Sequence, residues 1–293
     1  MNKGQSPLIA IGYIEYGATT APYLPFFLES LTRQTYSNVI ILSHDNTPGE
    51  GKDNIGFSRA YNKLIGEAIA QGAEYFLVIN PDTIHEPDMI EKLAAALENN
   101  HALGSVSPKI LSWDFSSNTK TNIIDSCGLR LHSALEFRDI GQGEVDRGQY
   151  DKTAILGPSG AAGLFRLSAL KAIQENNQYF DERFFMYKED CDLAYRLHMA
   201  GFASALIPQA LAYHDRTASG GTLSKRLLQR WDRTRSAKGY SFVNQHLLYR
   251  KYWTQQTSKD KFLIILHVFM RFGAAIVLEP YLLAHYRYII KRI

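Results

Sequence analysis

The chain is poor in cysteine: only Cys127 and Cys191 occur among its 293 residues, and their spacing matches no metal-binding motif. A cysteine-ligated metal centre is therefore not expected, and so few thiols indicate a reduced, cytoplasmic protein. The apolar run 8–14 is short, contains Gly12 and is followed at once by Glu15. A secretory signal peptide is therefore not predicted.

Neither sign of charge is in large excess: 32 Lys and Arg residues stand against 29 Asp and Glu residues, which gives a net charge of +3. That balance is too mild to indicate a nucleic-acid partner, and the basic residues are not interleaved with an aromatic binding motif. Hydrophobic residues make up 45% of the chain and aromatic residues 12%. This is enough to build a core, so extensive disorder is not expected.

Two phosphate-binding motifs are missing. No G-x-G-x-x-G follows the first predicted strand and no Walker A lysine loop occurs, which disfavours dinucleotide binding and P-loop chemistry. Residues 13–18, directly after that strand, contain no Lys or Arg. A sugar nucleotidyltransferase would need a basic, glycine-rich phosphate loop there, so this enzyme class remains only as an alternative.

Short apolar segments alternate with amphipathic ones along the first hundred residues. Strands are expected at 8–14, 38–43, 75–79 and 103–107. Helices with one apolar face are expected at 24–31, 54–68 and 90–97. Strands and helices that alternate at this length indicate parallel βαβ units, and hence an α/β fold with a mostly parallel sheet flanked by helices.

The second half of the chain is less regular. Residues 111–152 are polar and are predicted to form an irregular excursion with a hairpin. Further helices are expected at about 168–175, with Ser168 as N-cap, and at about 189–200, ending at Gly201. Short strands are expected at 203–207 and 211–213.

The tail is basic at 223–250 and strongly apolar at 262–290, and both parts are predicted to be helical. No charge-free run reaches the roughly 20 residues needed to span a bilayer. The tail is therefore expected either to make a peripheral membrane contact or to pack on the protein's own core. We predict a main domain at 1–222 and a C-terminal helical appendage at 223–293.

The segment 75–82 organises the chain. Five apolar residues predict a fully buried strand, and Asn80-Pro81-Asp82 predicts a turn after it. Ligands of open α/β sheets bind outside the carboxyl ends of the strands, so Asp82 is expected at the functional edge. A carboxylate there can hold a divalent cation, which can in turn hold a diphosphate. The simpler interpretation is an acidic turn after a core strand.

Two more polar groups follow the second predicted strand, Asp45 at its end and Asn54 in the next loop. If the first three strands are neighbours, Asp45, Asn54 and Asp82 line one crevice that would suit a nucleotide. Asp45 could instead be an ordinary loop acid, and Asn54 could cap the following helix.

Later in the chain, Glu189 and Asp190 begin a predicted helix and His214 ends a predicted strand. An acid near a metal site can serve as a general base, and a histidine can complete metal coordination. The alternatives are acids that stabilise a helix N-terminus and a histidine satisfied within the protein.

Taken together, four motifs resemble the family 2 glycosyltransferases, which have the GT-A fold, and among these the bacterial rhamnosyltransferase-type members. The motifs are Asp45-Asn46, Asn54-x-Gly56-Phe57-x-x-Ala60-x-Asn62, Asn80-Pro81-Asp82, and the block Phe180-Asp181-Glu182-x-Phe184-Phe185-Met186-Tyr187-x-Glu189-Asp190-x-Asp192-Leu193-x-x-Arg196 with Gly201. The resemblance covers residues 8–214, and the last motif is its most specific part.

This resemblance implies a Rossmann-like GT-A sheet and an inverting transfer from a nucleotide-sugar donor, with rhamnose from dTDP-rhamnose as the expected case. The expected acceptor is a cell-surface glycan or its lipid carrier, and the expected location is cytoplasmic, with contact at the inner face of the cell membrane. A scaffold that binds nucleotide sugars or glycans without catalysis is the alternative outside the enzymes.

The resemblance also assigns roles by position. Asp190 would be the catalytic base, with Glu189 beside it near the acceptor or the sugar. Asp82 and His214 would hold Mg²⁺ or Mn²⁺. The groups expected to contact the nucleotide are Asp45, Asn54, Gly56 and Asn80.

Overall fold

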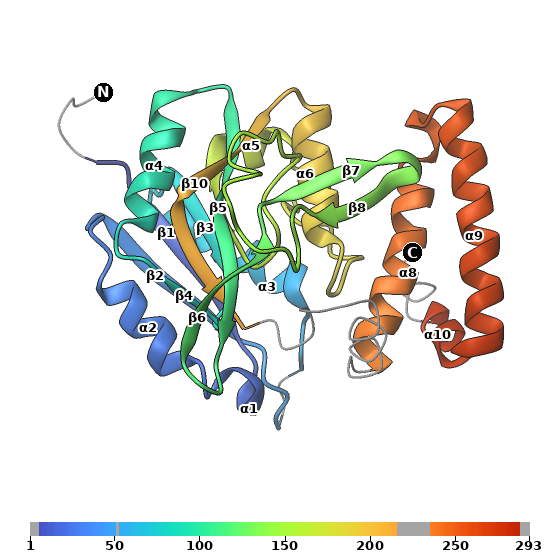
Figure 1. Ribbon diagram of the computed structural model, residues 1–293, viewed down its shortest axis with the longest axis horizontal. Coiled ribbons are helices and arrows are strands. Elements are labelled where there is room, and N and C mark those ends of the chain that lie inside the picture. The colour runs from blue at the N-terminus through green and yellow to red at the C-terminus, as the bar shows by residue number, and fades with distance from the viewer. Residues whose placement is uncertain (1–5, 51–52, 216–234, 288–293) are drawn as a thin grey trace.

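A computed structural model describes residues 6–50, 53–215 and 235–287 of the chain. Its centre is an eight-stranded sheet with the strand order β2-β1-β3-β9-β5-β10-β4, to which β6 is added beside β5 (Figure 1). The strands are β1 (Ile9–Glu15), β2 (Val39–Asp45), β3 (Tyr75–Ile79), β4 (Thr83–His85), β5 (Leu103–Asp114), β6 (Thr119–Ser126), β9 (Ala162–Arg166) and β10 (Ala203–His214).

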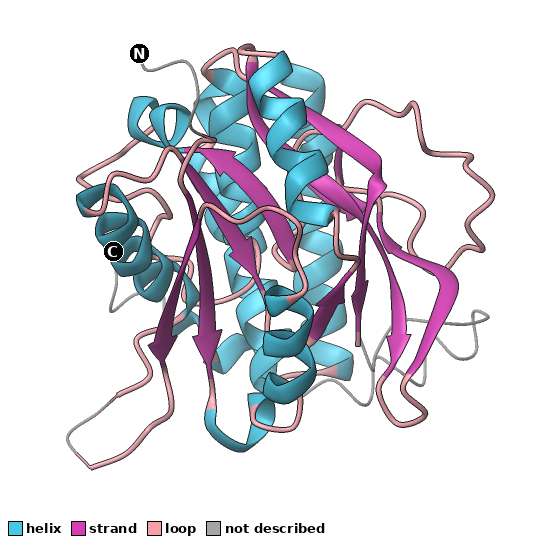
Figure 2. Cartoon of the chain, turned by 90° about the vertical axis from the view of Figure 1, so that its left-hand side faces the viewer, coloured by secondary structure: helices cyan, strands magenta, loops and turns pink. Residues whose placement is uncertain are grey.

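Five of these strands run in one direction. β1 pairs in parallel with β2 and β3, β10 pairs in parallel with β5, and β9 lies antiparallel between β3 and β5. β4 and β6 are also antiparallel to their neighbours. The carboxyl ends of β1, β2, β3, β5 and β10 therefore meet at one edge of the sheet (Figure 2).

Helices cover both faces of the sheet, which is why all five residues of β3 are buried. α2 (Leu24–Thr32) and α4 (Met89–Asn99) pack on the face that carries Ile9, Ile11 and Leu77. The opposite face, with Ala10 and Phe76, is covered by α3 (Phe57–Ala70), α5 (Leu167–Ala172) and α6 (Glu189–Met199). A short helix, α1 (Gly17–Thr20), follows β1.

Several local predictions need correction. Ser168 is not an N-cap, because α5 already begins at Leu167. The two short strands expected at 203–207 and 211–213 are one strand, β10, whose pairing with β5 is irregular between Ile207 and Leu211. The strand expected at 103–107 continues to Asp114, where it pairs with β6. Leu28, expected on the buried face of α2, is 37% exposed.

The excursion 111–152 contains the expected hairpin. β7 (Leu129–His132) and β8 (Glu136–Asp139) pair antiparallel through a 3-10 turn (Ser133–Leu135). Figure 1 shows this hairpin reaching from the sheet toward the C-terminal helices. Cys127 just before it and Cys191 on α6 are buried free thiols.

The tail forms helices, as expected, within the part that the structure describes. They are α8 (Arg235–Lys251), a 3-10 turn (Trp253–Gln255), α9 (Ser258–Leu278) and α10 (Tyr281–Ala284). The first residues of the helix expected at 223–250 lie outside the described residues. The division of the chain at residue 222 remains a prediction.

A buried group of charges joins α8 to α6. The Asp192 carboxylate accepts an ion pair from Arg196 at 2.8 Å and another from Lys251 at 2.8 Å, and the Tyr252 hydroxyl donates to it at 2.6 Å. Lys251 also contacts Asp181 at 2.9 Å. Because Asp192 is fully buried, removing its charge would leave two cations without their shared partner.

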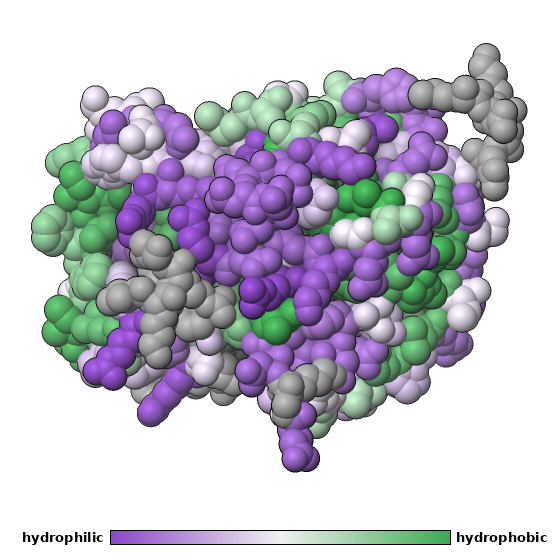
Figure 3. Space-filling model, turned by 180° about the vertical axis from the view of Figure 1, so that it is seen from behind, coloured by the Kyte–Doolittle hydropathy of each residue, from purple (hydrophilic) through white to green (hydrophobic). Residues whose placement is uncertain are grey.

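α9 presents its apolar residues to the outside. Its exposed side chains follow helical spacing and are Phe262, Ile265, Leu266, Phe269, Met270, Ile276, Val277 and Leu278. Apolar side chains gather along the edge of the molecule where α9 lies, at the left of Figure 3. The sequence contains no charge-free run of the required length, so no membrane-spanning segment was expected. Within the described residues, however, α9 is the one helix that is long and apolar enough to cross a membrane, by length and composition only.

We predict that Asp192→Ala lowers the free energy of unfolding by about 3–5 kcal/mol, because the variant leaves Arg196 and Lys251 buried without their common carboxylate. Urea unfolding followed by far-UV circular dichroism measures this loss. Glu29→Ala is the control, since its pair with Arg33 is largely exposed and should contribute less than about 1 kcal/mol. A loss in Asp192→Ala no larger than in the control would contradict the structural role of this network.

Candidate active site

The carboxyl edge of the sheet collects the polar groups that the sequence singles out. β2, β1 and β3 are adjacent, and Asp45, the last residue of β2, pairs in register with Glu15 of β1. Asp45 is exposed, and its Oδ1 accepts a hydrogen bond from the Thr47 N–H at 2.9 Å. Asp82 follows β3 on the same edge, so the three strands are the neighbours that the crevice hypothesis requires.

Asp82 and His214 are brought together by strand pairing. β4 begins directly after Asp82 and runs antiparallel to the end of β10, so that Thr83 lies opposite His214. The His214 Nε2 atom is consequently 3.2 Å from Asp82 Oδ2. The Asp215 N–H also donates to the Asp82 carbonyl at 3.0 Å, and the Thr83 hydroxyl closes the turn by donating to the Asn80 carbonyl at 2.6 Å.

A second carboxylate lies on the other side of the His214 ring. Asp125 Oδ2 is 2.9 Å from His214 Nδ1, and Asp125 is fully buried. Burial alone would lower the pKa of His214, but the charges of Asp82 and Asp125 outweigh it and raise that pKa to about 10. Asp125 was not predicted from the sequence, because it lies in the irregular excursion 111–152 and outside all four motifs.

The donor set at Asp82 and His214 fits a divalent cation that is also held by a ligand. Asp82 Oδ1 is buried and has no hydrogen-bond partner among the described residues. Across residues 6–50, 53–215 and 235–287, no group of three or more His, Cys, Asp or Glu side chains is arranged to hold a metal alone. One carboxylate and one imidazole leave coordination positions for phosphate oxygens, which is the usual arrangement for Mg²⁺ in nucleotide sites.

Asp190 lies close to the metal motif through a short connecting segment. Its Oδ2 accepts from the Gly160 N–H at 2.9 Å, and its Oδ1 accepts from the Cys191 N–H at 2.8 Å. The next residue, Ala161, accepts from the Asn80 N–H at 2.9 Å. The dipeptide 160–161 is therefore hydrogen-bonded both to the Asp190 carboxylate, through the Gly160 N–H, and to the Asn80-Pro81-Asp82 turn, through the Ala161 carbonyl.

Glu189 differs from its neighbour in its surroundings. It is buried, and its Oε2 has no hydrogen-bond partner within the described part of the chain. Burial, together with the charge of Asp190, raises the pKa of Glu189 well above its ordinary value, which favours the protonated form of this carboxyl group. The buried Tyr61 hydroxyl donates to the Ile79 carbonyl at 3.1 Å. Burial raises the pKa of Tyr61, the hydrogen bond to Ile79 opposes this rise, and the carboxyl groups of Asp82 and Glu189 add to it.

The backbone before Glu189 has an unusual conformation. Tyr187 and Lys188 both have positive φ angles, +69° and +74°, and such residues cost roughly 1–3 kcal/mol each unless their surroundings hold them. The buried Asn244 of α8 donates from Nδ2 to the Met186 carbonyl at 2.9 Å and to the Tyr187 carbonyl at 2.7 Å. A tail helix thus fixes the start of α6.

Asn54 and Gly56 shape the loop that enters α3. Asn54 Oδ1 accepts from the Gly56 N–H at 2.8 Å, so Asn54 forms a local turn and is not itself the N-cap, which is Gly56. Asn46, which is buried, bonds to the same loop at Ile55 N–H (3.0 Å) and at the Gly56 carbonyl (3.1 Å). The sequence placed Asn46 in a motif but did not assign it this role.

Gly56 is required by close packing. Its φ is +86°, and a Cβ at this position would lie 2.4 Å from Phe185 Cδ2 and 2.7 Å from the Phe185 carbonyl oxygen. The Phe57 N–H donates to that same carbonyl at 2.6 Å. Gly56 therefore joins α3 to the segment that carries Glu189 and Asp190.

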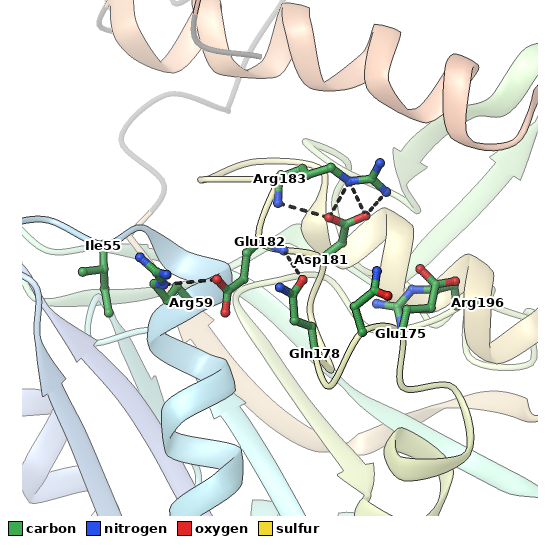
Figure 4. Close-up of a pocket in the computed structure, with 9 residues that line it drawn as sticks. Ile55, Arg59, Glu175, Gln178, Asp181, Glu182, Arg183 and Arg196 are labelled. Atoms are coloured by element: carbon green, nitrogen blue, oxygen red, sulfur yellow. Dashed lines mark hydrogen bonds and ion pairs between the residues drawn. The ribbon is translucent and has the colours of Figure 1, made fainter. Parts of the chain in front are cut away.

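A pocket of about 430 Å³ is lined by residues from the loop before α3 and from the segment before α6 (Figure 4). It is lined by Ile55, Arg59, Glu175, Asn176, Gln178, Asp181, Glu182, Arg183 and Arg196. Arg59 pairs with Glu182, Arg183 with Asp181 and Arg196 with Asp192. Since it contains none of the predicted site residues and its arginines are all paired, this pocket is not the candidate active site.

Comparison with known families is consistent with this geometry. The family described as glycosyltransferase like family 2 matches residues 32–234, well over half of the chain. The chain is 27% identical over 253 residues to the N-acetylglucosaminyl-diphospho-decaprenol L-rhamnosyltransferase of Mycobacterium tuberculosis, in both strain CDC 1551 / Oshkosh and strain H37Rv. That match covers 73% of this chain and 77% of the relative.

Among solved structures, the chain is similar to GalNAc-T7 crystallised with UDP, GalNAc and Mn²⁺, with a TM-score of 0.54 at 12% identity. The similarity covers 77% of this chain but only 48% of that one, so this chain spans about half the length of the solved protein. At this identity the comparison concerns the fold alone, and it confirms the predicted GT-A architecture.

We predict that Gly56→Ala destabilises the protein more than Gly72→Ala, at the other end of α3. Both glycines have positive φ, but nothing lies within 4 Å of a Cβ at Gly72. Gly72→Ala should cost about 1 kcal/mol from backbone strain, and Gly56→Ala a further 1–3 kcal/mol or so from the clash with Phe185. Equal free energies of unfolding for the two variants would show that the close packing of Gly56 against Phe185 does not contribute to stability.

Proposed function

The chain belongs to glycosyltransferase family 2 and is a glycosyltransferase with the GT-A fold, and we propose that it is an inverting, metal-dependent enzyme whose donor is dTDP-rhamnose. The similarity to a rhamnosyltransferase supports this donor. The name of that relative describes an acceptor sugar carried on a lipid diphosphate, and we propose the same class of acceptor, a hydroxyl of a lipid-linked or cell-surface glycan.

One observation supports this proposal most: the dipeptide 160–161 donates a backbone N–H to Asp190 and accepts one from Asn80, which begins the turn that ends at Asp82. An inverting transfer needs a base on one side of the anomeric carbon and stabilisation of the departing diphosphate on the other. Asp190 is partly exposed, and both of its oxygens accept a backbone N–H, which holds the carboxylate in one orientation.

The division of labour between the two acids follows from their surroundings. A general base must be ionised. Burial raises the pKa of Glu189 and so favours its protonated form, whereas Asp190 is partly exposed and accepts two backbone N–H groups, and we therefore assign the base to Asp190. Asp190 would take the proton of the acceptor hydroxyl as its oxygen attacks the sugar. Glu189 can instead donate a hydrogen bond to the sugar or the acceptor.

The leaving group would be held at the other side of the site. Asp82 and His214 would bind Mg²⁺ or Mn²⁺, and the bound cation would neutralise the nucleoside diphosphate as it departs. We propose that the nucleotide contacts Asp45, Asn54, Gly56 and Asn80. Of these, Asp45 is the exposed acid at the end of β2 and would accept from a base N–H.

The rival functions differ in what they need at the same edge. A sugar nucleotidyltransferase needs basic side chains after β1, and residues 13–18 contain none. A non-catalytic scaffold would not need Asp190 held by two N–H donors. Incubation with a panel of sugar nucleotides and Mg²⁺ or Mn²⁺, with release of nucleoside diphosphate as the readout, separates the three: only a transferase releases nucleoside diphosphate in an acceptor-dependent manner.

Asp190→Asn should reduce the rate of transfer by about 10²–10⁴-fold, the usual contribution of a general base. Donor binding, measured by calorimetry with dTDP-rhamnose and Mn²⁺, should be unchanged because the substitution does not touch the metal motif. Asp88→Asn, which alters an exposed acid paired with Lys92, is the control and should retain full activity. Undiminished transfer by Asp190→Asn would refute the assignment of the base.

We also propose that α9 attaches the enzyme to the inner face of the cell membrane, where a lipid-linked acceptor would lie. Two polar side chains of α9 face the hairpin: Arg271 pairs with Glu136 at 2.8 Å, and His267 lies 3.7 Å from the same carboxylate. Ile264 and Ala275 are buried on that same side. The outer side is a continuous apolar stripe, which supports contact with lipid rather than water.

The membrane contact predicts that Phe269→Glu and Val277→Glu each weaken binding to vesicles that contain anionic phospholipid by at least about tenfold. These two side chains are 72% and 77% exposed, so the substitutions should leave folding intact. Met199→Glu, at a site on α6 that is 55% exposed, is the control and should bind like the wild type. If the fraction of protein that stays in solution beside the vesicles is the same for the wild type and both α9 variants, this proposal is contradicted.

A further inference from the structure

Asp125 is placed by an irregularity in the sheet. In the pairing of β5 with β6, Ile110 lies opposite Ser126, but the next residue, Leu111, lies opposite Ile124. Asp125 is therefore the extra residue of a β-bulge. Bulges locally bend a strand and redirect a side chain, and they are frequent beside active sites.

The redirected side chain reaches His214 across β5. β6 and β10 both pair with the second half of β5, one on each side, yet Asp125 Oδ2 is 2.9 Å from His214 Nδ1. Asp125 is fully buried and His214 is 6% exposed. Burying a carboxylate costs free energy unless it has a partner. The His214 ring is such a partner for Asp125.

The contact decides which ring nitrogen carries the hydrogen. A carboxylate can only accept, so a neutral His214 must donate Nδ1–H to Asp125. Its Nε2 then presents a lone pair toward Asp82 Oδ2, at 3.2 Å. Two acceptors face one another at that distance, and only a proton or a cation between them resolves the repulsion. In the other tautomer, His214 would donate Nε2–H to Asp82, but its Nδ1 lone pair would then face the Asp125 carboxylate at the shorter distance of 2.9 Å.

We infer that Asp125 is a positioning residue that fixes the Nδ1–H tautomer of His214 and thereby turns the Asp82–His214 pair into a divalent-cation site. The inference rests on the proposed metal role of that pair and adds a residue that lies outside all four sequence motifs. Carboxylates that accept from the second nitrogen of a ligating histidine raise its basicity and hold its ring in orientation.

The test is the affinity for Mn²⁺, measured from the electron paramagnetic resonance signal of free Mn²⁺, with and without dTDP. Asp125→Asn should bind Mn²⁺ about 10–100-fold more weakly than the wild type. Asp114→Asn is the matched control: it removes the same charge from the same sheet at an exposed position and should change affinity by no more than about twofold, because exposed charges are screened. Circular dichroism verifies that each variant is folded.

A cycle with His214 separates positioning from a general loss of structure. If Asp125 acts through the ring, His214→Ala and His214→Ala/Asp125→Asn should bind Mn²⁺ equally well. A further loss in the double variant, or wild-type affinity in Asp125→Asn, would overturn the inference while leaving the proposed function intact. A wild-type protein that binds no Mn²⁺ even with dTDP would instead contradict the metal site itself, and the inference with it.

The wild-type protein offers a measurement that does not depend on any variant folding. With Mg²⁺ and dTDP bound, the ¹⁵N shifts of the His214 ring, assigned by comparison with His214→Ala, should show the hydrogen on Nδ1 and none on Nε2. A hydrogen on Nε2 would overturn the inference.

Discussion

The antiparallel pairing of β4 with the end of β10 is the constraint on which the rest of the site depends. It sets Thr83 opposite His214 and so brings two residues that are 132 positions apart, Asp82 and His214, to within 3.2 Å. The turn Asn80-Pro81-Asp82 is too short to move independently of β3 and β4, and the Thr83 hydroxyl closes it. The position of the Asp82–His214 pair is therefore determined by the sheet and not by a loop.

The acid at the start of α6 is held by three elements that meet around it. α3 contributes the Phe57 N–H and the Ser58 hydroxyl, which donate to the Phe185 and Phe184 carbonyls. α8 contributes Asn244, which holds the left-handed backbone at Tyr187. The charged group around Asp192 fixes α8 itself. The C-terminal helices therefore hold the start of α6 in place. They also carry α9, so the apolar stripe of α9 has a defined position relative to the candidate active site.

The sequence predicted the parts of this fold that repeat or that belong to a motif. The apolar run of β3 and the helical spacing of α3 and α4 follow from periodicity, and motif positions placed Asp82, Asp190 and His214 on the correct strand and helix ends. Asp125, Asn244 and the buried role of Asn46 could not be predicted, because each acts through a contact between distant segments. Neither a residue in a β-bulge nor a buried asparagine that bonds to a distant loop produces a periodic pattern in the sequence. The division between the main domain and the tail and the role of each site residue remain predictions.

The most direct test of the central claim is a crystal structure of the protein with dTDP and Mn²⁺, with data collected at the manganese absorption edge. The account predicts one anomalous peak within coordination distance of both Asp82 and His214 Nε2, with the diphosphate of dTDP on the same ion and Asp190 facing the opposite side of the donor site. A peak elsewhere on the protein, or dTDP bound with its diphosphate away from Asp82, would contradict it.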